Sequence, residues 1–438
     1  MNKQGVFISL VFAVCFVVGI LINSLGYEKI HSMVQKKMKE NFEKVFGEYL
    51  HRNPTNFSDG LKIDDNITTP FNTTQAEFDI IHEVLRTLRG RFDDSHLRQE
   101  SAKVNSTKLV MMYTPFFNDL NWLVKEEGYN TIDGTKCPYY QCEFTTDKKD
   151  FIRSDAVIFH ARDMTGLEEL RNLQKTRPTH QRWIYFIMES PIFTPDPSPY
   201  NGMFNWTLTY RPDSDLRFPY GNYFPRHTPW KEQESLKKII ASKTKLVFWA
   251  SSHCGLLRDK YVGKLRKFIN VDIFGACGAL LGGGAGSCAR FSKDCTEKLQ
   301  QYKFALAFEN YMCEDYITEK YWWRLLIGVV PVVMGGSKYD SKVAVPGSYI
   351  NAADFPTTQA LANYLLYLNK NNTAYMEFFE WKKKYVVRDT LKYFKCALCA
   401  KLNLDHKPKM YERLDETWSK TKHCGKTDKI FNDIINRS

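Results

Sequence analysis

Residues 304–336, FALAFENYMCEDYITEKYWWRLLIGVVPVVMGG, decide the fold class of this 438-residue chain. An apolar strand ends in Glu309-Asn310, and a loop leads to Thr318-Glu319-Lys320 at the start of an aromatic-rich helix. A second apolar strand follows and ends in Gly335-Gly336. Polar groups therefore gather where a strand ends and a helix begins, which is where α/β sheets bind their ligands.

This segment allows two interpretations. Backbone N–H groups at a helix N-terminus favour a bound phosphate. Lys320 adds a positive charge, and Glu319 can accept hydrogen bonds from the hydroxyls of a ribose or a sugar. The alternative is a surface helix whose first turn is capped by its own polar side chains. Taken alone, these residues do not separate a phosphate site from such a cap.

Strands and helices alternate on both sides of this segment. The predicted strands are 108–113, 156–160 and 183–188 in a first domain, and 246–250, 271–274, 304–308 and 329–334 in a second. Helical segments such as 258–268 separate them, and this alternation predicts parallel sheets. The predicted fold class is α/β, with two Rossmann-like domains (106–235 and 236–438) facing across a ligand cleft.

The first 105 residues show the pattern of a membrane anchor followed by a stem. Residues 6–22 form an apolar run about long enough to cross a thin bilayer. A cleaved signal peptide, ending near Ser24-Leu25-Gly26, is the alternative. Residues 30–50 repeat apolar side chains at helical spacing, so a stem helix could support a homodimer. The expected segments are a cytoplasmic tail at 1–5, a signal-anchor transmembrane helix at 6–25 and a stem at 26–105.

Glycosylation sequons indicate which side of the membrane holds the body of the protein. Three of seven N-x-S/T sequons fall within residues 56–72, in a polar stretch just after the anchor. This clustering predicts a lumenal stem and a glycoprotein. The sequons expected to carry glycans begin at Asn56, Asn66, Asn72, Asn105, Asn205 and Asn371, and a seventh begins at Asn436.

The cysteines fit an oxidising compartment. Eleven are present, and Cys15 lies inside the anchor, which leaves an even set of ten expected to form disulfides. Cys396 and Cys399 could form a redox or zinc half-site. Because this is the one such pair and no His partner is near, we interpret both as disulfide cysteines. Spacing does not assign the pairs, although 137/142 and 288/295 are close in sequence.

The formal net charge of +12 allows an anionic partner. Lys and Arg are spread along the chain, and no nucleic-acid-binding module is present, which argues against nucleic acid. A diphosphate-sugar donor would need only two or three of these charges. Residues 282–286 (GGGAG) lack the lysine of a phosphate loop and are interpreted as a flexible surface insertion. His160, at a strand end, is interpreted as a core or surface histidine.

Four blocks of this chain resemble, in order, the motifs of the α1,3-fucosyltransferase family, from about residue 108 to residue 399. Residues 304–336 resemble its donor-binding motif, with Tyr311 in place of the usual Ser. Residues 188–191 (MESP) resemble its ESP motif. The remaining blocks are 204–221, with Pro212 in place of a second Arg, and 251–278, with His253 near the position of the usual Asn.

The resemblance implies a type II Golgi membrane enzyme of the GT-B plan with a GDP-fucose donor and a glycan acceptor. The family transfers fucose in α1,3 linkage, here to GlcNAc of N-glycans or related chains, with inversion. Glu189 would be the general base, and Arg258 and Lys320 would stabilise the leaving diphosphate. Asn310, Tyr316 and Glu319 would hold the nucleotide and fucose. No residue is assigned to the acceptor.

A metal is not expected to be required. Asp213-Ser214-Asp215 has the D-x-D form that can hold Mn²⁺ against a nucleotide diphosphate. It lies in the first domain, away from the donor block, and in the family the same triplet belongs to the fold motif. Stimulation by Mn²⁺ or Mg²⁺ could still arise through the free diphosphate.

Two other functional classes compete with this interpretation. One is a glycosyltransferase of the same fold that uses another nucleotide sugar. The other is a non-catalytic lumenal glycan-binding protein. The second class has no need for Glu189, Arg258, Glu319 and Lys320 together, and their joint presence favours an enzyme.

Overall fold

The computed structural model describes residues 74–88, 106–121, 131–132, 135–137, 139, 141–230, 233–282, 284, 286–388 and 391–438. All of them belong to one compact unit of the chain, residues 59–438. The expected tail, anchor and stem helix lie outside the described residues and stay predictions. Within the described ranges, no helix combines the length and the apolar character needed to span a bilayer.

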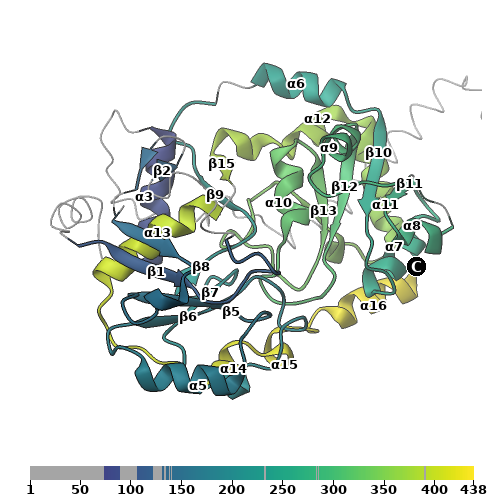
Figure 1. The fold of residues 1–438 in the computed structure, drawn as a ribbon. Helices are drawn as coiled ribbons and strands as arrows, with labels where there is room; N and C mark the ends of the chain where they lie inside the picture. Colours follow the sequence, from purple (N-terminus) through teal and green to yellow (C-terminus); the bar gives the residue numbers. More distant parts are fainter. Residues whose placement is uncertain are drawn as a thin grey trace, which may run out of the picture. The chain divides into compact units, whose positions relative to one another are not determined.

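The first sheet is parallel throughout and takes its strands from the first half of the chain (Figure 1). Its strand order is β4 (Cys142–Thr145), β1 (Lys108–Met112), β5 (Ala156–His160), β6 (Arg182–Ile187), β7 (Trp206–Thr209) and β8 (Leu216–Arg217). The central strands are apolar along nearly their whole length because both faces of the sheet are covered. Met111 and Val157 lie in the core of one face, and Val110 and Ile158 lie in the core of the other.

The second sheet is also parallel and contains the 304–336 segment. Its strand order is β11 (Val271–Phe274), β10 (Lys245–Ala250), β12 (Tyr302–Phe308), β13 (Val330–Met334) and β14 (Ile350–Asn351). β12 is buried at every position, and its register sets Phe308 opposite Met334 of β13. The two strands therefore end together, and the Glu309 N–H donates to the Met334 carbonyl at 2.8 Å.

Helices connect and cover these strands. In chain order they are α3 (Gln75–Thr87), α5 (Leu167–Thr176), α6 (Gln233–Ala241), α7 (Leu257–Leu265), α8 (Cys277–Leu280), α9 (Lys293–Gln300), α10 (Glu319–Leu326), α11 (Thr358–Lys370), α12 (Asn372–Glu377), α13 (Leu391–Leu404), α14 (Leu414–Thr417), α15 (Lys420–His423) and α16 (Asp428–Arg437). α10 begins at its N-cap, Thr318, whose hydroxyl accepts from the Lys320 N–H. Its buried face, with Tyr321 and Trp322, packs against Ala307 of β12 and Val333 of β13.

The end of the chain crosses from the second sheet back to the first. β15 (Tyr385–Arg388) pairs antiparallel with β9 (Asn222–Pro225). In the first half of the chain, β2 (Thr131–Ile132) pairs antiparallel with β3 (Thr135–Lys136). α13 then lies against the first sheet, where Phe394 and Leu398 join the core of Val110 and Ile158. α16 packs instead against α7 of the second sheet. The C-terminal segment therefore packs against the first sheet through α13 and against α7, a helix of the second half, through α16.

The ten cysteines outside the predicted anchor all form disulfides, as expected. The pairs are Cys137–Cys396, Cys142–Cys399, Cys254–Cys277, Cys288–Cys295 and Cys313–Cys424. Cys396 and Cys399 thus bond to partners far back in the sequence rather than to each other. The two disulfides hold α13 beside α3 and the edge of the first sheet. Closing such long loops restricts the unfolded chain and favours the folded state.

The alternating pattern of the sequence does fold as parallel α/β sheets. The strands at 156–160 and 271–274 agree with the prediction residue for residue, whereas β12 begins two residues earlier than predicted. β4, β7 and β8 were missed. Each has at most four residues, and CEFT, WTLT and LR interrupt their apolar residues with polar ones, so none forms the apolar run that marks a buried strand.

Gly336 is required where β13 leads into the next loop. A Cβ built there would lie 2.4 Å from the Met312 carbonyl carbon and 2.5 Å from the Cys313 nitrogen, both backbone atoms. We expect Gly336→Ala to lower the free energy of unfolding by about 2 kcal/mol or more, because the loop must move to make room. The measurement is the midpoint of thermal unfolding of the purified protein.

Gly263→Ala is the matched control. Gly263 lies inside α7, and a Cβ there meets the Leu281 side chain at an ordinary 3.6 Å. Replacing a helical Gly by Ala should raise stability by about 0.5–1 kcal/mol. Equal unfolding midpoints for the two variants would contradict the close approach at Gly336.

Candidate active site

A hydrogen bond joins residues that follow β6 of the first sheet and β12 of the second. Glu189 follows β6 and is half-buried. Tyr316 lies in the loop between β12 and α10 and is buried. The Tyr316 hydroxyl donates to Glu189 Oε2 at 3.1 Å. The second carboxylate oxygen, Oε1, has no hydrogen-bond partner among the described residues, so it is available to accept a proton.

Two further tyrosines surround this contact. The rings of Tyr210 and Tyr220 lie 5.2 and 6.1 Å from the Tyr316 ring. The Tyr220 hydroxyl donates to the carbonyl of Met188, the residue before Glu189, at 3.0 Å. Burial, together with the charge of Glu189, raises the pKa of Tyr316 well above its ordinary value. The Tyr316 phenol therefore keeps its proton and remains a donor to the carboxylate.

Glu309 is a fully buried carboxylate at the end of β12. It accepts hydrogen bonds from the Thr318 N–H at 2.8 Å and from the Thr318 hydroxyl at 2.9 and 3.0 Å. Lys320 Nζ lies 3.3 Å from Glu309 Oε2. Burial raises the pKa of Glu309, and Lys320 acts against that rise. The carboxylate thus fixes the first turn of α10 and holds Lys320 in place.

Arg258, on α7, donates hydrogen bonds to residues at the carboxyl ends of two strands, β10 and β12. Its Nη1 donates to the Phe308 carbonyl at 3.1 Å, and its Nη2 donates to the Ser251 hydroxyl at 2.9 Å and the His253 carbonyl at 3.0 Å. Burial lowers the pKa of Arg258, and nearby carboxylates act in the opposite direction. The guanidinium is buried behind Ser251, so it positions the carboxyl ends of β10 and β12.

A pocket of about 270 Å³ opens at this edge of the second sheet. Its wall combines residues 250–252 at the end of β10, Gly275, the 288–290 loop and the start of α10. Its volume is near the lower end of small-molecule pockets. The first backbone N–H groups of α10 give this end of the pocket a preference for an anion. The charged residues that line it are Arg290, Glu319, Lys320 and Arg324.

The pocket carries more positive than negative charge. Glu319 Oε1 lies 3.5 Å from both Arg290 Nη1 and Lys320 Nζ. Burial acts to raise the pKa of Glu319, but Lys320 and Arg290 outweigh it and lower the pKa overall. Arg324 is buried, and burial lowers its pKa to about 10, so it stays charged near neutrality. An anionic ligand suits this arrangement.

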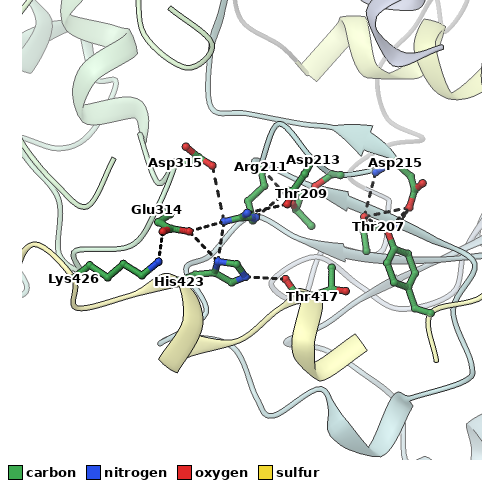
Figure 2. A network of polar contacts seen from close by, with 12 residues as sticks. Thr207, Thr209, Arg211, Asp213, Asp215, Glu314, Asp315, Thr417, His423 and Lys426 are labelled. Carbon is green, nitrogen blue, oxygen red and sulfur yellow. Dashed lines mark hydrogen bonds and ion pairs between the residues drawn. The ribbon is translucent and has the colours of Figure 1, made fainter. Parts of the chain in front are cut away.

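A polar network holds the loop that carries Tyr316 (Figure 2). Arg211, after β7, donates to Asp213 through Nε at 2.9 Å and Nη2 at 2.8 Å. Its Nη1 lies 3.7 Å from Glu314 and 3.9 Å from Asp315. The residues just before Tyr316 are therefore tied to the loop between β7 and β8 of the first sheet.

The C-terminal segment secures the same loop from a second side. Cys313 is bonded to Cys424. Glu314 accepts a hydrogen bond from Lys426, and its Oε2 lies 3.0 Å from His423 Nδ1 (Figure 2). Burial acts to raise the pKa of Glu314, but the Lys426 and His423 contacts lower it to about 2. Ionised Glu314 thus anchors the loop at neutral pH.

Both carboxylates of the D-x-D triplet, Asp213 and Asp215, bind side chains of the protein. Asp213 is bound to Arg211 by two hydrogen bonds. Asp215 is buried, accepts from the Tyr411 hydroxyl at 2.7 Å and pairs with Lys409. Across the part of the chain that the structure describes, no group of three or more His, Cys, Asp or Glu residues is arranged to hold a metal. Both carboxylates are therefore engaged by protein cations and hydroxyls.

Asn310, His253 and His160, the remaining positions discussed from the sequence, differ in how far they are buried. Asn310 is half-buried, and its Oδ1 has no partner within the described ranges. His253 uses its backbone carbonyl to accept from Arg258, while its side chain is exposed. His160 is fully buried with Nδ1 at 2.6 Å from Asp163 Oδ2, which agrees with a core histidine.

The structure argues against a glycan on Asn205. This side chain is buried, and its Nδ2, the atom that a glycan would modify, donates to the Lys409 carbonyl at 2.8 Å. Its Oδ1 accepts from the Trp183 N–H at 2.8 Å. A glycan would break these bonds and has no room in the core, so the expectation for Asn205 is corrected. Asn371 caps α12 and Asn436 is exposed, and the other four sequons lie outside the described residues.

The predicted residues fall into three places. Glu189 and Tyr316 meet where the sheets approach each other, Glu319 and Lys320 line the pocket, and Arg258 lies behind its wall. Sequence reasoning missed the pocket cations Arg290 and Arg324. The Cys288–Cys295 pair that brackets Arg290 is the signal that could have located it, since a short disulfide loop fixes the residues it encloses.

Comparison with known proteins gives consistent matches across the chain. Residues 105–221 match the family described as "Fucosyltransferase, N-terminal", and residues 240–418 match "Glycosyltransferase family 10 (fucosyltransferase) C-term". "Alpha-(1,3)-fucosyltransferase C" of Drosophila melanogaster is 33% identical over 376 residues, which are 77% of this chain and 85% of the relative. Human "4-galactosyl-N-acetylglucosaminide 3-alpha-L-fucosyltransferase 9" is 36% identical over 303 residues, or 67% and 80% of the two chains.

One relative and one solved structure match less closely. Human "Alpha-(1,3)-fucosyltransferase 4" is 35% identical over 285 residues, which span 57% of this chain and about half, 52%, of the relative. The solved structure titled "Crystal Structure of alpha1,3-Fucosyltransferase with GDP-fucose" has a TM-score of 0.39 and 15% sequence identity. The similarity covers 77% of this chain and 96% of that one.

The ion pairs of Glu314 predict a pH dependence of stability. A carboxylate whose pKa is depressed in the folded state stabilises it above the pKa of the unfolded chain, near 4.5, and this contribution is lost as pH falls toward about 2. Because the side chain is about one-third exposed, we expect a contribution of about 1 kcal/mol. Glu314→Gln should lower the unfolding midpoint at pH 6 and have a much smaller effect near pH 2. The exposed Glu416→Gln is the control, and an equal effect at both pH values would contradict the prediction.

Proposed function

This chain belongs to glycosyltransferase family 10, the fucosyltransferases, and from that premise we propose that it transfers fucose from GDP-fucose to GlcNAc of a glycan in α1,3 linkage with inversion. The enzyme class follows from the family matches at both ends of the catalytic region. The resemblance of the motifs supports GDP-fucose as the donor, and the names of the relatives support transfer of fucose in α1,3 linkage.

The Tyr316–Glu189 hydrogen bond is the observation that carries the proposal. It joins the end of a strand in the first sheet to the loop that leads into α10 and the cationic pocket. Tyr316 occupies one carboxylate oxygen of Glu189, so the carboxylate has a defined orientation. The other oxygen is without a partner among the described residues. A base held this way can address one acceptor hydroxyl.

In the proposed reaction the acceptor hydroxyl oxygen attacks the anomeric carbon of fucose. Its proton passes to Glu189 Oε1, while the bond from the anomeric carbon to the diphosphate oxygen breaks and its electron pair stays with GDP. One displacement of this kind inverts the configuration, so a single carboxylate suffices and no second nucleophilic carboxylate is needed. The Tyr316 hydrogen bond stabilises the carboxylate before the proton arrives.

The leaving diphosphate gains negative charge as that bond breaks. In this proposal Lys320 and Arg290 contact the diphosphate, because both line the pocket beside the α10 N-terminus. Arg258 acts from behind Ser251, adding its charge at longer range and holding the strand ends. Glu319 and Asn310 supply acceptors for ribose and fucose hydroxyls. Fixed cations of this kind stabilise the transition state electrostatically.

The acceptor and the cellular location belong to the same proposal. The name of the human relative that is 36% identical describes a 4-galactosyl-N-acetylglucosaminide as its acceptor, which supports a GlcNAc residue as the target here. The apolar run near the N-terminus and the sequons of residues 56–72 support a type II protein of the Golgi membrane with its catalytic body in the lumen. The stem pattern at 30–50 supports a homodimer.

The experiment that tests the function uses a defined glycan panel. Incubation of the purified protein with GDP-fucose should add one deoxyhexose, placed at O3 of GlcNAc by mass spectrometry and linkage analysis. Glu189→Gln should keep GDP affinity and lose at least about a hundredfold in turnover, because the acceptor proton has no base. Glu168→Gln, an exposed carboxylate on α5, is the matched control. Transfer from another nucleotide sugar, or full turnover by Glu189→Gln, would refute the donor or the base respectively.

Lys320→Ala tests the leaving-group contact. Loss of a charge-assisted contact should weaken GDP binding by about tenfold or more. The measurement is isothermal calorimetry with GDP, with the unfolding midpoint recorded alongside because Lys320 also pairs with buried Glu309. Lys293→Ala, a fully exposed lysine on α9, should bind GDP like the wild type. An unchanged affinity in Lys320→Ala would place the diphosphate elsewhere.

A further inference from the structure

A second, smaller pocket of about 150 Å³ lies away from the residues assigned to the reaction. Three segments build it: Arg86 and Thr87 at the end of α3, residues 212–217 around β8, and Lys342 in the loop after β13. It shares no lining residue with the pocket at the start of α10. Three of its seven lining residues are cations and one is an acid, so the lining carries a net positive charge.

The two arginines are only partly satisfied by the protein. Arg217 Nη2 donates to the Lys342 carbonyl at 2.9 Å, and no carboxylate of the described residues lies within ion-pair distance of the Arg217 guanidinium. Arg86 pairs with Glu83 and donates to Asn222 Oδ1 at 3.3 Å. The Nε atoms of Arg86 and Arg217 are both buried and have no hydrogen-bond partner among the residues that the structure describes. Buried donors of this kind are normally paired.

The pocket's single acidic lining residue does not balance these charges. Asp215 accepts from the Tyr411 hydroxyl at 2.7 Å and the Thr207 N–H at 3.0 Å, and it pairs with Lys409. Burial and the neighbouring Arg217 lower the pKa of Arg86 well below its ordinary value. Burial also lowers the pKa of Arg217 to about 10, although Asp315 and Asp340 act against this at longer range. Two like charges are thus held together in a low-dielectric site.

We propose that Arg86, Arg217 and Lys342 form a binding site for a small oxyanion, a sulfate, phosphate or carboxylate group, separate from the nucleotide pocket. The planar guanidinium fork matches the geometry of such groups and binds them with paired hydrogen bonds. A volume of about 150 Å³ holds one such group and excludes a nucleoside. The bound group comes either from a free inorganic anion or from an acidic or sulfated sugar of a glycan.

The test is a calorimetric titration of the full-length protein with inorganic sulfate while GDP saturates the other pocket. Arg217→Gln and Lys342→Gln should each weaken sulfate binding by about tenfold. Lys342 is exposed, so its variant should fold even if Arg217→Gln does not. Arg413→Gln and Lys293→Gln remove surface cations elsewhere and should bind sulfate like the wild type. The comparison with these variants is needed because sulfate also stabilises proteins non-specifically.

A second series of titrations identifies the source of the group. GlcNAc 6-sulfate and glucuronate are compared with uncharged GlcNAc. Tighter binding of the charged sugars than of inorganic sulfate assigns the site to a glycan, and the reverse order assigns it to a free anion. Sulfate binding that is absent, or that both variants leave unchanged, overturns the proposal. Fucose transfer and GDP affinity are measured separately, so the proposed function stands or fails independently.

Discussion

A buried carboxylate at the end of β12 sets the geometry of this enzyme. Glu309 is inaccessible to water and must be satisfied by the protein, and the groups that satisfy it are the backbone and hydroxyl of Thr318 and the ammonium of Lys320. Since a buried charge without partners costs several kcal/mol, the start of α10 has one stable position relative to β12. The pocket wall formed by Glu319 and Lys320 follows from that position.

The same constraint closes the loop that reaches the first sheet. Both ends of the 310–317 loop are fixed, one by the strand and the other by Thr318. The Cys313–Cys424 disulfide and the ion pairs of Glu314 hold the middle of this loop. Because Gly336 has no side chain, the loop backbone can pass close to it. Tyr316 is therefore presented to Glu189 by a loop with little freedom. Rigid support of this kind suits the general-base role proposed for Glu189, because proton transfer depends on a narrow range of distances.

Charge is divided between the two sides of the proposed reaction. The first sheet contributes the carboxylate of Glu189 at the end of β6, and the second sheet contributes the cations beside the pocket, Lys320 and Arg290. Arg258 is buried between strand ends and links the two roles, since its guanidinium binds the Phe308 carbonyl next to Glu309 and the Ser251 hydroxyl at the pocket wall. This division suits a displacement in which the acceptor proton passes to Glu189 and the negative charge develops on the diphosphate beside Lys320 and Arg290.

The sequence alone determined the α/β class, the central strands, the family and the presence of ten disulfide-bonded cysteines, but not which cysteines pair, because apolar runs, motif order and cysteine count are local or compositional signals. It also placed Glu189, Glu319 and Lys320 at strand and helix ends. Only the tertiary structure decided that Tyr316 meets Glu189, that Arg258 lies behind Ser251, that Asn205 is buried and that α13 returns to the first sheet. These facts join residues tens to hundreds of positions apart, and the burial that enforces such contacts exists only once the chain has packed.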